Sequence, residues 1–192
     1  MTTETMSVTL DSLLRVLMPP GERSFVRLAV GPERGEPERF FMRRGNHWAA
    51  CDQQGSGFED FIVAHGARGS KFSPIAWASY SYGSPMLAAW AVWSSVQGEV
   101  SNGAKPSITI DEGDRMTSLW LLRSPIYDMA ELKGLLERLR RVHGGNASLA
   151  APRDALISIP GTKTVNIVPA KTVAVIAWDP TRTYDVGKVV PS

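Results

Sequence analysis

The densest group of acidic side chains in this 192-residue sequence is Asp111, Glu112 and Asp114. The group follows an apolar segment with the character of a strand, and carboxylates that converge at its end could bind Mg²⁺ or Ca²⁺. Asp and Gly are also ordinary turn residues, so a solvated hairpin turn is the simpler interpretation. We therefore treat the three acids as weak candidates for metal ligands, and we predict no metal or other cofactor unless they converge.

Apart from Arg115, the basic side chains that could pair with phosphate groups gather in two parts of the sequence. One part is the polar side of a predicted helix that starts at Asp128, and the other is the segment after residue 160. Glu131 and Glu137 partly neutralise the helix, so a merely solvated surface is the alternative there. The basic residues predicted to bind nucleic acid are Arg115, Lys133, Arg138, Arg140, Arg141, Lys163 and Lys171.

Aromatic side chains could hold unpaired bases. Tyr80 and Tyr82 are two residues apart, so on a strand they share one face and could stack on bases. Both are therefore added to the predicted nucleic-acid-binding residues. Strand tryptophans are more often part of a core, which is the preferred interpretation of Trp90, Trp93 and Trp120.

Nucleophilic and histidine chemistry has less support in the sequence. Ser94 and Ser95 are not surrounded by a nucleophile-elbow pattern. His47 and His65 lack partners at metal-ligand or catalytic-triad spacing, so we interpret both as structural or surface residues.

Composition limits the class of protein. With 43% hydrophobic and 21% charged residues, the chain can bury one sizeable core, and we expect a single domain over residues 1–192. A net charge of +2 attracts a polyanion weakly unless the basic residues cluster. Cys51 is the only cysteine, so an internal disulfide is excluded. With neither an export signal nor an apolar run of about 18 residues, we expect a cytoplasmic protein without membrane contact.

The elements that must position these residues are of mixed type. Helices are predicted over residues 9–17, over residues 58–64 and from Asp128, whose capping-box spacing precedes an apolar face that includes Val142. Residues 45–73 are otherwise predicted to be loops. Strands are predicted at residues 25–30, 39–42, 75–82, 87–96, 106–110, 117–122, 155–159, 165–168 and 172–178. Strands and helices do not alternate regularly, which indicates the α+β class.

Residues 106–184 resemble the archaeo-eukaryotic primase superfamily, in particular the primase-polymerase domains of phages, plasmids and integrated elements. The matching string is PSITIDEGDRMTSLWLLRSPIYDMAELKGLLERLRRVHGG, followed by DALISIPGTKTVN and VAVIAWDPTRTY. The residues before this string match only in their broad strand pattern. The resemblance implies a primase-polymerase-like core, an RRM-like mixed or antiparallel sheet flanked by helices.

The resemblance also implies metal-dependent nucleotide addition, in which acidic side chains hold divalent cations and a histidine contacts the phosphates. The family's carboxylate pair falls on the strand that here contains Ser94 and Ser95, its histidine falls at Thr117, and its third acid falls near Pro152, with Asp154 the only close acid. Neutral hydroxyls do not replace carboxylates as ligands of hard cations. We therefore predict a degenerate active site without catalytic residues.

Three hypotheses remain open at this point. The preferred one is a catalytically inactive primase-polymerase-like protein that binds single-stranded DNA or a primer-template. It would serve a polymerase, a helicase or an active primase in the replication of a phage or mobile element. The second is an active, divergent DNA primase-polymerase that holds Mg²⁺ or Mn²⁺ with Asp111, Glu112 or Asp114. The third is a protein-interaction or inhibitory module that does not bind nucleic acid, in line with the small net charge.

Overall fold

The computed structural model describes residues 8–18, 24–30, 38–44, 47–51, 57–79, 85–98, 103–145, 151–164 and 167–189. The helices in this part are α1 (Leu10–Leu17), α2 (Phe58–His65), α3 (Met129–His143) and α4 (Val186–Val189), with a short 3-10 helix, η1 (Gly66–Arg68). The strands are β1 (Phe25–Val30), β2 (Glu38–Arg44), β3 (His47–Ala50), β4 (Ser70–Phe72), β5 (Ala76–Trp77), β6 (Met86–Val96), β7 (Ile108–Asp111), β8 (Met116–Ile126), β9 (Ile157–Ser158), β10 (Ala174–Trp178) and β11 (Thr183–Tyr184).

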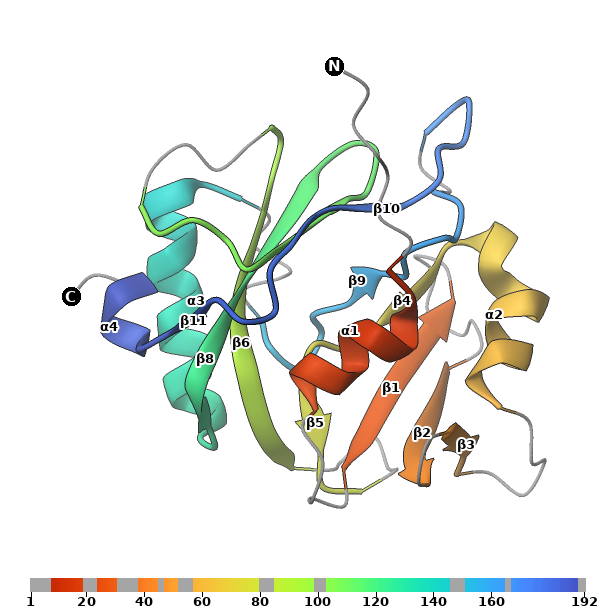
Figure 1. Ribbon diagram of the computed structural model, residues 1–192, viewed down its shortest axis with the longest axis horizontal. Coiled ribbons are helices and arrows are strands. Elements are labelled where there is room, and N and C mark those ends of the chain that lie inside the picture. Colours follow the sequence, from red (N-terminus) through yellow and green to blue (C-terminus); the bar gives the residue numbers. More distant parts are fainter. Residues whose placement is uncertain are drawn as a thin grey trace.

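The described strands join into one sheet in the order β10-β7-β8-β6-β5-β1-β2-β3. Beside this path, β11 pairs with β8, and β4 pairs with both β1 and β9. The β11–β8 pair is parallel, and the other strand pairs are antiparallel. The predicted α+β class, with a mixed or antiparallel sheet flanked by helices, is confirmed (Figure 1).

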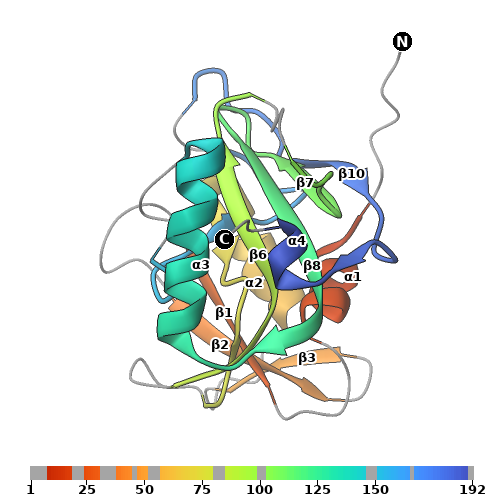
Figure 2. The ribbon, with the colours of Figure 1, turned by 90° about the vertical axis from the view of Figure 1, so that its left-hand side faces the viewer.

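Helices α1 and α3 lie on opposite faces of the long central strands β6 and β8 (Figures 1 and 2). The Thr9 hydroxyl caps α1 by accepting a hydrogen bond from the Ser12 amide, and the Asp128 carboxylate caps α3 by accepting one from the Glu131 amide. Each helix buries four leucines: Leu10, Leu13, Leu14 and Leu17 in α1, and Leu132, Leu135, Leu136 and Leu139 in α3. The prediction that Val142 belongs to the apolar face of α3 is wrong, because this side chain is 49% exposed.

The two faces of the β6-β8-β7-β10 part of the sheet can be assigned from its register, because directly opposed residues in an antiparallel pair share a face. The side that we call the inner face carries the opposed residues Ser95, Thr117, Ile110 and Val175. The other side, which we call the outer face, carries Ser94, Ser118, Thr109 and Ala177. Helix α3 lies on the outer face, where the Ser94 hydroxyl donates a hydrogen bond to the Gly144 carbonyl at the end of the helix.

Some predicted strands are shorter in the structure, and one is not formed in the described residues. Strand β5 covers two residues of the segment predicted at 75–82, and β9 covers two of the segment predicted at 155–159. Of the strand predicted at residues 165–168, the first two residues lie outside the described part, and the last two are bends. Val168 is 97% exposed, so a β-branched residue here gains nothing from strand packing.

Two strands, β3 and β4, occupy a segment that was predicted to contain only loops and one helix. Strand β3 pairs with β2, and β4 pairs with β1 on one side and β9 on the other. Strand β4 is held by hydrogen bonds to two strands distant in the sequence, which a local pattern does not reveal, whereas β3 pairs with the neighbouring strand β2. The predicted helix at residues 58–64 is confirmed as α2.

Candidate functional site

At one end of the inner face, Ser95 of β6 and Thr117 of β8 lie opposite each other. Both occupy positions at which the resemblance implies metal or phosphate ligands. Trp93, two residues before Ser95 and on the same face, is 2% exposed. The inner face therefore presents an indole ring and a hydroxyl group on the strand where the resemblance implies a carboxylate pair, and the Thr117 hydroxyl where it implies a histidine.

Glu112, at the start of the turn between β7 and β8, is buried, and both of its carboxylate oxygens accept hydrogen bonds from protein groups. One carboxylate oxygen accepts a hydrogen bond from the Thr117 hydroxyl. The other accepts bonds from both the hydroxyl and the amide of Ser158 in β9, the latter at 3.1 Å. The prediction of a solvated turn is thus wrong for Glu112, because its carboxylate joins the central strands to β9.

The other two acids of the turn have separate partners. Asp111 accepts a hydrogen bond from the Gly113 amide at 2.7 Å, and Asp114 forms an ion pair with Arg115 at 3.2 Å. Asp154 is the only acid near the position at which the resemblance implies a third metal ligand, and it is exposed in a turn. Among the residues that the structure describes, no group of three or more His, Cys, Asp or Glu side chains is placed to hold a metal ion.

Four basic side chains gather at the same turn, and we call Lys71, Arg115, Lys163 and Lys171 the turn cluster: Arg115 belongs to the turn, Lys71 to β4, and Lys163 and Lys171 to the chain after residue 160. Three of them, Lys71, Arg115 and Lys163, line one small cavity of about 20 Å³ together with Glu112 and Ser158. The ammonium group of Lys171 approaches the Gly113 carbonyl at 3.5 Å. The structure thus brings together three residues that were predicted to bind nucleic acid, Arg115, Lys163 and Lys171.

Lys71 has the most protected position of the turn cluster. Burial lowers the pKa of its ammonium group, while the negative charge of Glu112 opposes this effect. In the β4–β9 pair, Lys71 lies opposite Ser158, whose hydroxyl is held by Glu112. Sequence reasoning missed both Lys71 and Ser158, because only the pairing of these two distant strands places them beside the turn.

A hairpin of the chain after the Pro-Gly-Thr turn presents Lys163 and Lys171. The Thr162 hydroxyl donates a hydrogen bond to the Ile159 carbonyl at 2.7 Å, which closes the turn, and Gly161 has a φ of +88°. Beyond it, the Thr164 amide bonds to the Lys171 carbonyl, and the Lys171 amide bonds to the Thr164 hydroxyl. These bonds fix the backbone of both lysines next to the turn between β7 and β8.

A cavity of about 450 Å³ opens beside the turn cluster and is lined by Ser95, Val96, Gln97, Asp114, Arg115 and Gly145. The Ser95 hydroxyl is buried and has no hydrogen-bond partner among the described residues. Gly145 packs tightly against β6, since a Cβ atom there would lie 2.6 Å from the Ser95 carbonyl oxygen. Asp114 and Arg115 line both the 450 Å³ cavity and the 20 Å³ cavity, so these turn residues lie between the two cavities.

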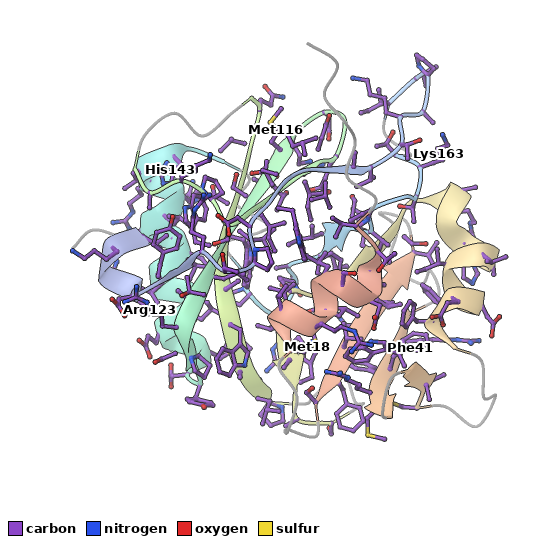
Figure 3. The ribbon with its side chains drawn as sticks, viewed as in Figure 1. Met18, Phe41, Met116, Arg123, His143 and Lys163 are labelled. Atoms are coloured by element: carbon purple, nitrogen blue, oxygen red, sulfur yellow. The ribbon has the colours of Figure 1, made fainter. Side chains whose placement is uncertain are left out.

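The basic residues of α3 form a separate group. Lys133, Arg138 and Arg141 are exposed and Arg140 is half-buried, with Lys133 4.0 Å from Glu137. Figure 3 shows His143, the last residue of α3, far across the molecule from Lys163. The predicted nucleic-acid-binding residues therefore divide into two groups, and Tyr80 and Tyr82 lie outside the described residues.

No protein-family model and no curated protein sequence matches the chain. The structure is similar to the AEP domain of the primase-polymerase of cyanophage S-2L, with a TM-score of 0.64 over 94% of both chains and 16% sequence identity. In the described residues, no helix is long and apolar enough to cross a membrane. The similarity at this low identity concerns the architecture, and it shows that the chain has the fold of a primase-polymerase domain.

Proposed function

We propose that this protein is a catalytically inactive relative of primase-polymerases that binds nucleic acid during the replication of a phage or mobile element. Its partner would be an active polymerase, helicase or primase, and its ligand single-stranded DNA or a primer-template. The observation that carries the proposal is the turn cluster, which gathers four cations from three segments on a primase-polymerase fold, while the positions at which the resemblance implies metal ligands hold uncharged side chains.

The side chains at the positions of the expected active site, and their hydrogen bonds, oppose metal-dependent catalysis. Metal-assisted phosphoryl transfer needs anionic oxygens that are free to coordinate the cation. Ser95 and Thr117 supply neutral hydroxyls, and Glu112 already accepts three hydrogen bonds from protein groups. Coordination of a metal by Glu112 would strip Thr117 and Ser158 of their acceptor, which opposes the rearranged site of the active alternative.

The positive charges of the turn cluster favour the binding of nucleic acid. Phosphate groups along a strand attract Lys and Arg, and each neutralised phosphate releases counterions. Lys163 and Lys171 are exposed on the hairpin, and Arg115 lines the 450 Å³ cavity. A strand that crosses the turn would contact the three side chains in succession.

The binding proposal is tested by the affinity for a labelled single-stranded oligonucleotide at several salt concentrations. We expect the triple variant Arg115→Ala, Lys163→Ala, Lys171→Ala to bind more weakly, with a salt slope reduced by about 0.7 for each phosphate that the protein no longer neutralises. The matched control has the same change of charge on α3, Lys133→Ala, Arg138→Ala, Arg141→Ala, and is expected to have the smaller effect. A greater weakening in the α3 variant would place the interface on the helix instead.

Unmodified protein that binds no oligonucleotide even at low salt would overturn the proposal and favour the third hypothesis, an interaction or inhibitory module. The catalytic part is tested separately by primer synthesis and primer extension with Mg²⁺ and with Mn²⁺. We expect neither activity. Robust synthesis that is abolished by Asp111→Ala would instead establish an active, divergent primase-polymerase.

A further inference from the structure

The outer face of the sheet contains a depression that the proposed function does not use. Ser118, Thr109 and Ala177 lie side by side across β8, β7 and β10, and their small side chains form its floor. The cavity above them has a volume of about 240 Å³. It lies on the opposite side of these strands from Ser95 and Thr117, so it is separate from the site around the turn cluster.

The walls of this cavity are mainly apolar. Met116 of β8, Ile176 of β10 and Pro106 before β7 line it. Ile176 reaches the cavity because the register of β10 shifts between Val175 and Ala177, so that it is an extra residue in the ladder. Figure 3 shows Met116 well apart from Lys163 of the turn cluster.

The rim of the cavity is held in place by three side chains. Three successive carbonyl groups, those of Ala104, Lys105 and Pro106, accept hydrogen bonds from the Trp120 indole at 2.7 Å, the Tyr184 hydroxyl at 2.6 Å and an Arg182 guanidinium nitrogen at 3.0 Å. An irregular segment with every carbonyl tethered loses little freedom when a ligand binds. The cavity is therefore preformed.

Polar groups occur at two places in the cavity. At the floor, Ser118 is only 2% exposed and Thr109 is half-buried, and both hydroxyl-bearing residues line the cavity. Each hydroxyl can both donate and accept a hydrogen bond. At the rim, Lys105 is exposed, and its ammonium group supplies a positive charge. Asp111, the cross-strand partner of Met116, lies toward the other end of β7.

We propose that this outer-face cavity binds a single nucleotide, with the base on the floor and the phosphate at Lys105. The flat apolar ring fits between Met116 and Pro106, where a thioether contact favours aromatic rings. The hydroxyls of Ser118 and Thr109 pair with the donors and acceptors at the edge of the base. The volume is below the roughly 300 Å³ of the smallest typical ligand pockets, so the cavity accepts one base. Asp111 repels the phosphate from the other end.

The proposal is tested by NMR of protein with ¹³C-labelled methionine methyl groups, titrated with deoxyadenosine monophosphate and, separately, with a short 5′-phosphorylated single strand. We expect a saturable shift of the Met116 methyl signal, assigned with Met116→Leu. A shift with the mononucleotide identifies a free nucleotide as a sufficient ligand, and a shift with the strand alone identifies a strand residue. The absence of a Met116 shift with both probes at millimolar concentration overturns the proposal.

Three variants separate this cavity from the turn cluster. Ala177→Phe fills the cavity and should abolish the shift, while unchanged signals of the buried Met18 and Met86 show that the protein is folded. Thr109→Val keeps the shape of the side chain and should weaken binding about 5-fold through the loss of one hydrogen bond. Lys163→Ala in the turn cluster should leave the titration unchanged, so failure of one proposal does not imply failure of the other. A Met116 shift that persists in Ala177→Phe would also overturn the assignment.

Discussion

The inner and outer faces of the central strands differ in how their polar groups are used, although both carry hydroxyl side chains at the same level of the sheet. On the inner face, Thr117 donates to Glu112, which is tied in turn to Ser158. On the outer face, Thr109 and Ser118 line an open cavity. The Glu112 carboxylate on the inner face therefore stabilises the fold. The hydroxyl groups on the outer face instead face a cavity, where they can donate hydrogen bonds to a ligand and accept them from it.

The difference teaches that a buried carboxylate beside the central strands can be held entirely by protein groups. A buried carboxylate is tolerated only when its oxygens are hydrogen-bonded, and Glu112 meets this condition with three donors. The same bonds connect β8 to β9, and β9 pairs with β4 in the other half of the sheet. The turn that presents the cations is consequently anchored to both halves of the molecule.

The largest expected effect is from Glu112→Ala. The change leaves the Thr117 hydroxyl and the Ser158 amide and hydroxyl without their acceptor, which should lower the free energy of unfolding by roughly 3 kcal/mol. Urea denaturation measures it. Asp114→Ala, which removes an acid with 41% of its side chain exposed, is the control and should change stability little. Equal stabilities of the two variants would contradict the structural role of Glu112.

An intermediate effect is expected from Gly145→Ala. Both Gly144 and Gly145 have positive φ values, +74° and +121°, so alanine is strained at either position. Only at Gly145 would the new Cβ also meet a backbone atom, the Ser95 carbonyl oxygen at 2.6 Å. Thermal or urea unfolding should therefore find Gly145→Ala less stable than Gly144→Ala by roughly 2 kcal/mol. If the two variants unfold alike, the close packing of this segment on β6 is refuted.

The smallest expected effect concerns His143, whose ring stacks on Trp120 at the outer face with centroids 5.5 Å apart. Burial lowers the pKa of His143 below its ordinary value, so the unfolded chain binds a proton more readily than the folded one. The free energy of unfolding should fall as the pH drops below about 6.5, and the fall should end once the pH is below the folded pKa. At higher pH, His143 is neutral in both the folded and the unfolded chain, and the free energy of unfolding no longer depends on its protonation.

Melting curves between pH 8 and pH 5 check this prediction by comparison with His143→Phe. Phenylalanine keeps an aromatic ring against Trp120 and cannot titrate, so it should remove this part of the pH dependence. The difference in melting temperature between the unmodified protein and His143→Phe at each pH removes the contributions of other titrating groups. Identical pH profiles would show that the stack does not disfavour the protonated ring.

Local sequence patterns predicted the elements that depend on near neighbours. Asp128 caps α3, as its spacing before Glu131 predicted, and the apolar segment at residues 87–96 forms β6. The absence of carboxylates at Ser94 and Ser95 is likewise a property of the sequence. These features follow from side-chain chemistry and from spacing along one strand or helix, which do not require knowledge of the rest of the fold.

The tertiary structure alone decided which polar residues meet. Glu112 was expected in solvent and is buried, because β9 brings Ser158 to it from a distant part of the chain. Lys71 joins Arg115 and Lys163 only through the β4–β9 pairing. The outer cavity likewise depends on the register shift in β10. Such contacts are set by strand pairing between remote segments, and local propensity carries no information on that pairing.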